Sequence, residues 1–208
     1  MLGADLPSLT TGLRGLAYWE IEVTGPNRDL HSGHFGGAVA NPINTLCSML
    51  AQVIGEDGHI TIPHFYDDVE EVPAAEREMI AQIPFDEKKY MEAIGVKALK
   101  GEKGYSTLER NSCRPSFDIC GIWGGYTGEG SKTVLPSKAY AKVSCRLVPH
   151  QNHAVISQLF VDYIPVSYTH LDVYKRQYLY NKKLDFNILL PDLRTTGLSG
   201  GKIGRAHV

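Results

Sequence analysis

The 208-residue sequence has few cysteines, no excess of one charge and no long apolar run, and each absence excludes a class of protein. Its 21 lysine and arginine residues nearly balance its 23 aspartate and glutamate residues. A net charge of −2 argues against nucleic acid or an anionic membrane as a partner. The four cysteines form no Cys-x-x-Cys pair and no signal peptide precedes them, so we expect reduced thiols in a cytoplasmic protein.

The most informative stretch is a glycine-punctuated loop at residues 25–37, which carries His31. Residues 17–24 alternate between apolar and polar side chains, the period of a strand with one face on a core. After the loop, Asn41 supplies a helix cap, Pro42 suits the first helical position, and apolar residues recur at helical spacing. The sequence therefore predicts that His31 lies on a loop between a strand and the N-terminus of a helix.

The order of the remaining elements predicts an α+β fold. Strands are expected at residues 116–123 and 133–148, and a second helix begins at Asn152. Together with the first strand and helix, this order is a ferredoxin-like, split β-α-β pattern whose last strand is missing or replaced. Residues 55–115 interrupt the pattern as an acidic insertion broken by prolines, with short helical stretches between residues 74 and 94.

Four motifs, taken in order along the chain, carry a family resemblance. They are TTGLRG at 10–15, VTGPNRDLHSG at 23–33, GIWGGYTGEGSKTVLP at 121–136 and RLVP at 146–149. In this order they resemble the lid, or dimerisation, domain of carnosinase-like cytosolic dipeptidases, which belong to the two-metal aminoacylase and carboxypeptidase family of metallopeptidases. The resemblance covers residues 1–164, and four motifs in one order are far more specific than a single short pattern.

The resemblance implies a parent protein that is a hydrolase acting on dipeptides and a homodimer joined through its lids. In such enzymes a catalytic domain holds two divalent ions, zinc or manganese, through residues that flank the lid in the sequence. Neither flank is present here, and the chain opens on residues that resemble those after the first catalytic segment. We therefore expect that this chain alone is an excised lid, without its own metal ions and without activity.

The resemblance also assigns roles to three residues. His31 corresponds to the lid histidine that reaches across the dimer and hydrogen-bonds the oxygen that becomes negative in the tetrahedral intermediate. Arg146 lies on the polar face of the third expected strand, and its planar guanidinium suits bidentate binding of a peptide's terminal carboxylate. Thr133 follows the glycine-rich turn at residues 124–130, whose backbone can approach a ligand closely, and is expected to contact the substrate.

Several other interpretations remain open or are disfavoured. The chain could be a non-catalytic dimerisation or peptide-binding module, or the lid of an aminoacylase or desuccinylase of the same family. A metal site at His31 and His34 is disfavoured, because two loop histidines without a third ligand seldom hold zinc. The glycine-rich turn lacks the Gly-Lys-Ser/Thr ending of a phosphate loop, so nucleotide binding is not expected.

The end of the chain does not resemble the family. Residues 165–177 resemble a string that recurs at junctions in translated metagenomic assemblies, and residues 203–208 back-translate to the start of a common sequencing adapter. We therefore interpret residues 165–208 as a chimeric, non-native tail, and residues 1–164 as the lid domain.

Overall fold

The computed structural model describes residues 12–166 and 172–177. The elements are β1 (Gly15–Thr24), β2 (Leu30–His31), α1 (Ser32–Phe35), α2 (Pro42–Ala51), α3 (Ala74–Ala81), α4 (Glu87–Ile94), α5 (Thr107–Ser112), β3 (Ser116–Gly124), β4 (Val134–Leu135), β5 (Lys138–Leu147), α6 (His153–Val166) and β6 (Asp172–Gln177). No helix in these ranges is long and apolar enough to cross a membrane.

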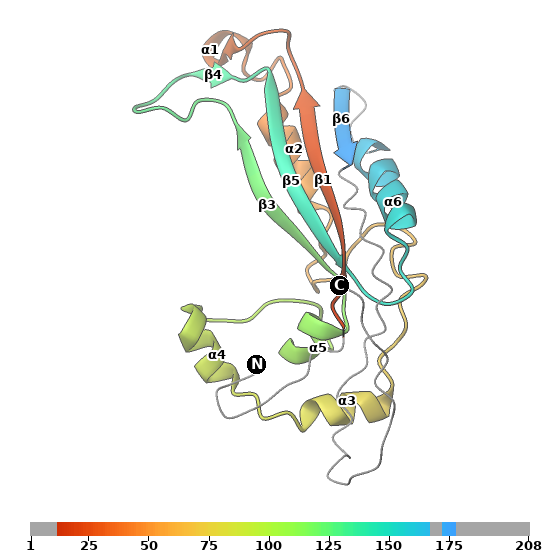
Figure 1. The fold of residues 1–208 in the computed structure, drawn as a ribbon. Coiled ribbons are helices and arrows are strands. Elements are labelled where there is room, and N and C mark those ends of the chain that lie inside the picture. Colours follow the sequence, from red (N-terminus) through yellow and green to blue (C-terminus); the bar gives the residue numbers. More distant parts are fainter. Residues whose placement is uncertain (1–11, 167–171, 178–208) are drawn as a thin grey trace, which may run out of the picture.

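A four-stranded antiparallel sheet in the order β3-β5-β1-β6 forms the centre of the fold (Figure 1). β1 and β5 pair along their whole length, from Gly15 opposite Leu147 to Thr24 opposite Lys138. This order of strands and helices confirms the predicted α+β class. The position left for a missing or replaced last strand is filled by β6, which pairs with residues 19–24 of β1.

β6 comes from the segment that the sequence marks as a chimeric tail. Its backbone pairing is a structural fact, whereas the foreign origin of residues 165–208 stays a prediction. The rest of that tail, residues 167–171 and 178–208, lies outside the described residues.

One face of the sheet is covered by α2 and α6 and forms the core (Figure 1). Alternate residues of β1 and β5 point into it, as the period of two predicts, and Trp19, Ile21 and Val143 are almost completely buried. The Trp19 ring stacks on Phe160 of α6 with 4.4 Å between the ring centroids. Burial of this face also raises the pKa of the Cys145 thiol.

The strand β3 lies at the open edge of the sheet (Figure 1). Its pairing with β5 is interrupted by a bulge between Ile119 and Gly121. Large apolar side chains stay exposed along it, with Ile119 at 47%, Ile122 at 49% and Trp123 at 42%. An edge strand with exposed apolar side chains is a surface on which another chain can pair.

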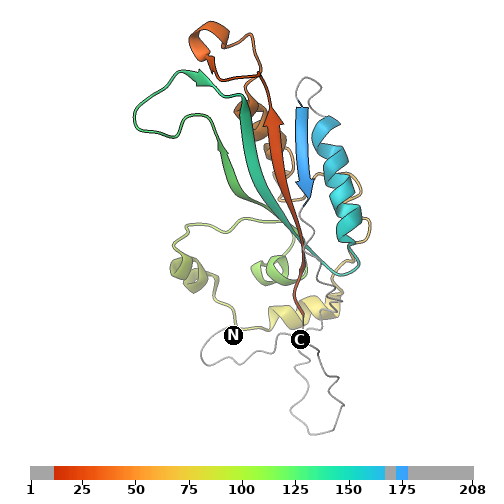
Figure 2. The same ribbon diagram turned by 45° about the horizontal axis from the view of Figure 1, so that its top comes forward.

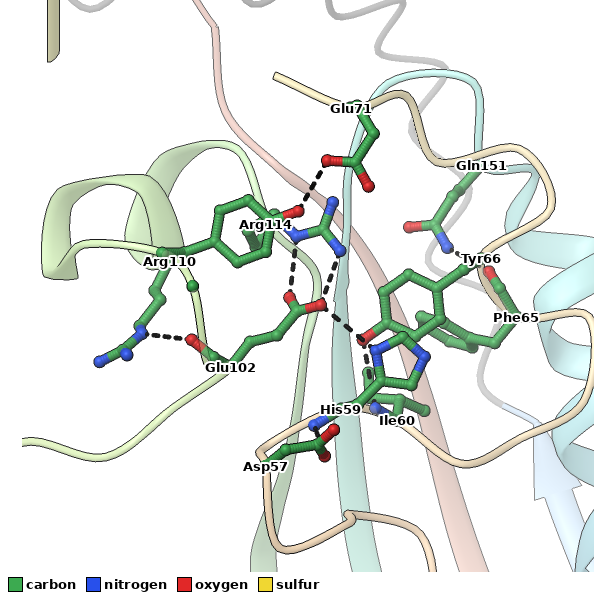
Figure 3. Close-up of polar contacts among 12 residues, drawn as sticks. Asp57, His59, Ile60, Phe65, Tyr66, Glu71, Glu102, Arg110, Arg114 and Gln151 are labelled. Carbon is green, nitrogen blue, oxygen red and sulfur yellow. Dashed lines mark hydrogen bonds and ion pairs between the residues drawn. The ribbon is translucent and has the colours of Figure 1, made fainter. Parts of the chain in front are cut away.

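The insertion, residues 55–115, lies mostly beyond one end of the sheet, opposite to α1 (Figure 2). Three apolar residues of the insertion join the apolar core, namely Ile60, Ile62 and Phe65. The insertion also contains a buried polar cluster around Arg114, which is only 3% exposed (Figure 3). The guanidinium donates to both Glu102 oxygens, at 2.8 and 2.7 Å, and lies over the Tyr105 ring at 4.3 Å. The ring of His59 stacks on Tyr66, and its Nδ1 is 3.3 Å from Glu102. Glu102 therefore contacts both Arg114 and His59, which lie at opposite ends of the insertion in sequence.

Two helices of the insertion, α3 and α4, are those predicted between residues 74 and 94. A third, α5, was not predicted, although its capping signal is in the sequence. The Ser106 hydroxyl accepts from the Glu109 N–H, and the Glu109 carboxylate accepts from the Ser106 N–H, which is a capping box. Six residues are too few to show apolar periodicity, so only this cap indicates the helix.

Candidate functional site

His31 lies at the end of β2, where it pairs with Val134 of β4. Its ring folds back over the backbone, and Nδ1 accepts a hydrogen bond from the Gly33 N–H at 3.1 Å. A Cβ at position 33 would lie 2.9 Å from the ring carbon Cε1, closer than side chains tolerate. Glycine at position 33 therefore permits the ring to sit against the start of α1.

The second predicted residue, Thr133, meets this ring. The distance from its Oγ1 to His31 Nε2 is 3.0 Å, and the Ser32 N–H donates to the Thr133 carbonyl at 3.1 Å. Because Nδ1 accepts from a backbone N–H, the neutral ring must carry its proton on Nε2, which donates to Thr133. Both side chains are exposed. Both ring nitrogens of His31 are therefore hydrogen-bonded within the chain, and the ring lies at the surface with its tautomer set.

An open groove of about 520 Å³ adjoins this pair. It is lined by Ser32 and Val134, which are the chain neighbours of His31 and Thr133, by Leu135, and by residues 36–41 together with Asn44 and Thr45 of α2. Within the described residues, no group of three or more histidine, cysteine, aspartate or glutamate side chains is placed to hold a metal ion.

The third predicted residue, Arg146, lies elsewhere. It is exposed near the far end of β5, opposite Leu16 of β1 and Ser116 of β3. Lys138, at the histidine end of β5, is eight residues away, or about 26 Å at the usual rise of a strand. The structure therefore brings His31 and Thr133 together and separates both from Arg146.

The surroundings of Arg146 include a second arginine. Arg14 is half-buried, and its Nη1 donates to the carbonyls of Arg110 at 3.2 Å and Arg114 at 2.8 Å. Burial, and then the nearby charge of Arg146, lower the pKa of Arg14. This corner of the sheet thus holds two arginines, with the carboxylate of Asp118 also near Arg14.

Asp29 and Ser137 form a hydrogen-bonded pair close to His31 that no sequence motif indicated. One carboxylate oxygen of Asp29 accepts from both the N–H of Ser137, at 2.8 Å, and its hydroxyl, at 3.0 Å. These hydrogen bonds, the backbone one first, lower the pKa of Asp29. The partners are 108 residues apart, so no local pattern indicates the pair.

Comparison with known proteins identifies the family. A family model described as a peptidase dimerisation domain matches residues 11–170. The chain belongs to this family. The peptidase dimerisation domain is 34% identical over 163 residues to a Cys-Gly metallodipeptidase of Schizosaccharomyces pombe, covering 78% of this chain and 34% of that protein. It is also 34% identical over 155 residues to a rat Beta-Ala-His dipeptidase, and the match covers 74% of this chain and 32% of that protein. The chain thus spans about a third of the length of these curated relatives.

Solved structures agree with this peptidase dimerisation domain. The di-peptidase Dug1p of Saccharomyces cerevisiae superimposes with a TM-score of 0.73 at 30% identity, covering 84% of this chain and 37% of that one. Human carnosine dipeptidase 1 superimposes with a TM-score of 0.71 at 29% identity, and the match covers 83% of this chain and 38% of that chain. These findings confirm the resemblance to carnosinase-like dipeptidases and the α+β lid fold.

Proposed function

We propose that this chain is the lid and dimerisation domain of a metal-dependent dipeptidase, in which it contributes substrate and oxyanion contacts. His31 and Thr133 act in the active site of the partner subunit, and Arg146 acts in the active site of its own subunit. The relatives that support a dipeptidase are a Cys-Gly metallodipeptidase and a Beta-Ala-His dipeptidase.

The separation of the two groups carries the proposal. Arg146 lies near one end of the ten-residue strand β5, and His31 lies beyond the other end, where Lys138 is about 26 Å from Arg146 along the strand. An extended dipeptide spans only about 7 Å. A single substrate therefore cannot contact both residues of one lid, whereas each lid of a dimer can serve two active sites.

The chemistry of each residue suits its place. The Nε2–H of His31 donates to Thr133 in this structure, and we propose that on substrate binding it donates instead to the carbonyl oxygen that becomes negative as the peptide bond is attacked. Such a preorganised donor is worth ~10²–10³ in rate. Thr133 holds the ring and can hydrogen-bond the same substrate. The guanidinium of Arg146 binds the terminal carboxylate of the dipeptide through two parallel hydrogen bonds.

The described residues do not form a site for the two divalent ions, zinc or manganese, that the parent enzyme would use. Ligands for these ions would come from parts of the parent protein outside this chain. The ions would supply electrophilic activation of the peptide carbonyl. The residues of this chain are proposed only to bind and orient the substrate and to donate the hydrogen bond from His31.

The dimer is proposed to be a homodimer formed through the lid. The open edge β3, with its exposed Ile119, Ile122 and Trp123, supports this because paired edges from two copies can satisfy each other's backbone groups. We also propose a cytoplasmic location. The four cysteines are free, which suits a reducing compartment.

Two substitutions in a full-length enzyme rebuilt around this lid test the proposal. His31→Ala should lower kcat by ~10²–10³ with little change in metal content, as expected for the loss of one oxyanion donor. Arg146→Lys keeps the charge but loses the bidentate geometry, and it should raise KM more than it lowers kcat. Unchanged turnover in His31→Ala would instead favour a non-catalytic dimerisation or peptide-binding module.

A further inference from the structure

We infer that Asp29 is a positioning residue for His31, because it holds Ser137 and thereby sets the register in which His31 meets Thr133. The catalytic meaning of this inference rests on the function proposed above, but its structural content does not.

Ser137, directly before β5, is hydrogen-bonded to the loop at residues 25–37 that carries His31. Its carbonyl accepts from the N–H of Gly25, at 2.8 Å, just where β1 ends. Its N–H and hydroxyl both donate to one carboxylate oxygen of Asp29. All three polar groups of Ser137 therefore contact the segment that leads from β1 to His31.

Beyond this junction the register rests on one short strand pair and on the hydrogen bond from the Ser32 N–H to the Thr133 carbonyl. β2 and β4 are only two residues long, with Leu30 opposite Leu135 and His31 opposite Val134. Such a short pair is marginal alone, and a slip by one residue turns every side chain to the other face. A slip here would move the His31 ring away from Thr133 and break the contact at Nε2. Asp29 is two residues before His31, so its two hydrogen bonds to Ser137, here called the Asp29–Ser137 clamp, act directly on this register.

The charge of Asp29 strengthens the clamp. Like any exposed aspartate it is ionised at neutral pH, and a hydrogen bond to a carboxylate is stronger than one to a neutral oxygen. Lys132 is the nearby opposite charge. An asparagine at position 29 would keep the acceptor oxygen and lose the charge, which makes it the conservative variant.

The test measures the two ring nitrogens of His31 by long-range ¹H–¹⁵N NMR on the 208-residue chain, assigned by their loss in His31→Gln. In the parent chain, Nδ1 should show the shift of an acceptor and Nε2 that of a protonated nitrogen. Asp29→Ala should move the two shifts towards each other and speed hydrogen exchange at the Ser32 amide about tenfold. The amides of Ile21 and Val143 in the sheet should keep their protection.

Matched variants separate positioning from a general loss of structure. Asp57→Ala is the control, because Asp57 also accepts from a nearby backbone N–H, that of His59, in a turn of the insertion. It should leave the His31 nitrogens unchanged. Asp29→Asn should retain most of the parent signature, and Ser137→Ala, which keeps the backbone N–H, should give an intermediate shift.

An unchanged His31 signature and an unchanged Ser32 exchange rate in Asp29→Ala would overturn the inference. If Asp29→Ala unfolds the sheet, seen as lost protection at Ile21 and Val143, then Ser137→Ala decides, and no shift of the His31 nitrogens in that variant would overturn it. None of these measurements needs turnover. A failure of the proposed dipeptidase function would therefore leave this result standing, and the reverse also holds.

Discussion

The sheet and the insertion are held together by different interactions. The sheet is stabilised by a buried apolar face in which Trp19 and Phe160 stack, whereas the insertion is organised around the buried ion pair of Arg114 and Glu102. Apolar burial tolerates gradual change, but a buried charge that loses its partner is strongly unfavourable. The candidate site differs from both, because His31 and Thr133 are exposed and depend on a few hydrogen bonds.

The largest loss of stability is expected from Trp19→Ala. The ring is 1% exposed and stacked on Phe160, so its removal leaves a cavity and should lower the free energy of unfolding by about 3–5 kcal/mol. Val155→Ala is the control, since this side chain of α6 is 48% exposed. The control should lose less than about 1 kcal/mol in denaturant titration. Equal losses would contradict the account of the core.

Glu102→Gln should act mainly on the insertion. It leaves the Arg114 guanidinium buried without its counter-charge, which should cost about 3 kcal/mol. Hydrogen exchange should show that amides between residues 55 and 115 lose protection while those of β1 and β5 keep theirs. The exposed Glu56 in the same insertion offers a control, Glu56→Gln, with almost no effect. Uniform loss of protection would show that the two regions unfold as one.

A smaller loss is expected from Glu109→Gln, about 1–2 kcal/mol at neutral pH, because glutamine can still accept from the Ser106 N–H but loses the ion pair with Arg77. Burial raises the pKa of Glu109, but hydrogen bonds from Arg77 and Ser106 outweigh it and lower the pKa overall. With the folded pKa lowered, the stabilisation is present above the unfolded value, about 4.3, and is lost as pH falls through the folded value. The difference between parent and variant, followed by thermal unfolding, should shrink in acid; a constant difference would contradict this.

The smallest effect on stability is expected at the site. Thr133→Val keeps the shape of an exposed side chain and removes the acceptor of the His31 Nε2–H. The free energy of unfolding should change by less than about 0.5 kcal/mol. In the rebuilt enzyme kcat should nevertheless fall, because the ring is no longer held. A loss of stability as large as that of Glu102→Gln would mean that Thr133 is structural.

The same contrast explains what could be predicted from the sequence. The strands β1 and β5 and the helices α2 and α6 were predicted because one face of each is apolar, and this leaves a period along the chain. The ion pair of Arg114 and Glu102 leaves no such period, so the interior of the insertion was not predicted.

The site was predicted only in part. His31, Thr133 and Arg146 came from motifs, and the structure adds that the first two meet and the third does not. The pair of Asp29 and Ser137 was missed, because contacts between residues 108 positions apart depend on the folded topology. The last strand was predicted to be missing or replaced, and the backbone of residues 172–177 occupies its place through ladder hydrogen bonds that need no particular side chains.

The central claim is that His31 and Arg146 of one lid serve different active sites, and mixed dimers of the rebuilt enzyme test it directly. His31→Ala and Arg146→Met homodimers should each be strongly impaired. In a mixed dimer, one active site combines the intact His31 of one subunit with the intact Arg146 of the other, so activity should return to about half that of the parent dimer. Mixed dimers as inactive as both homodimers would contradict the account, because they would place His31 and Arg146 of one lid in the same active site.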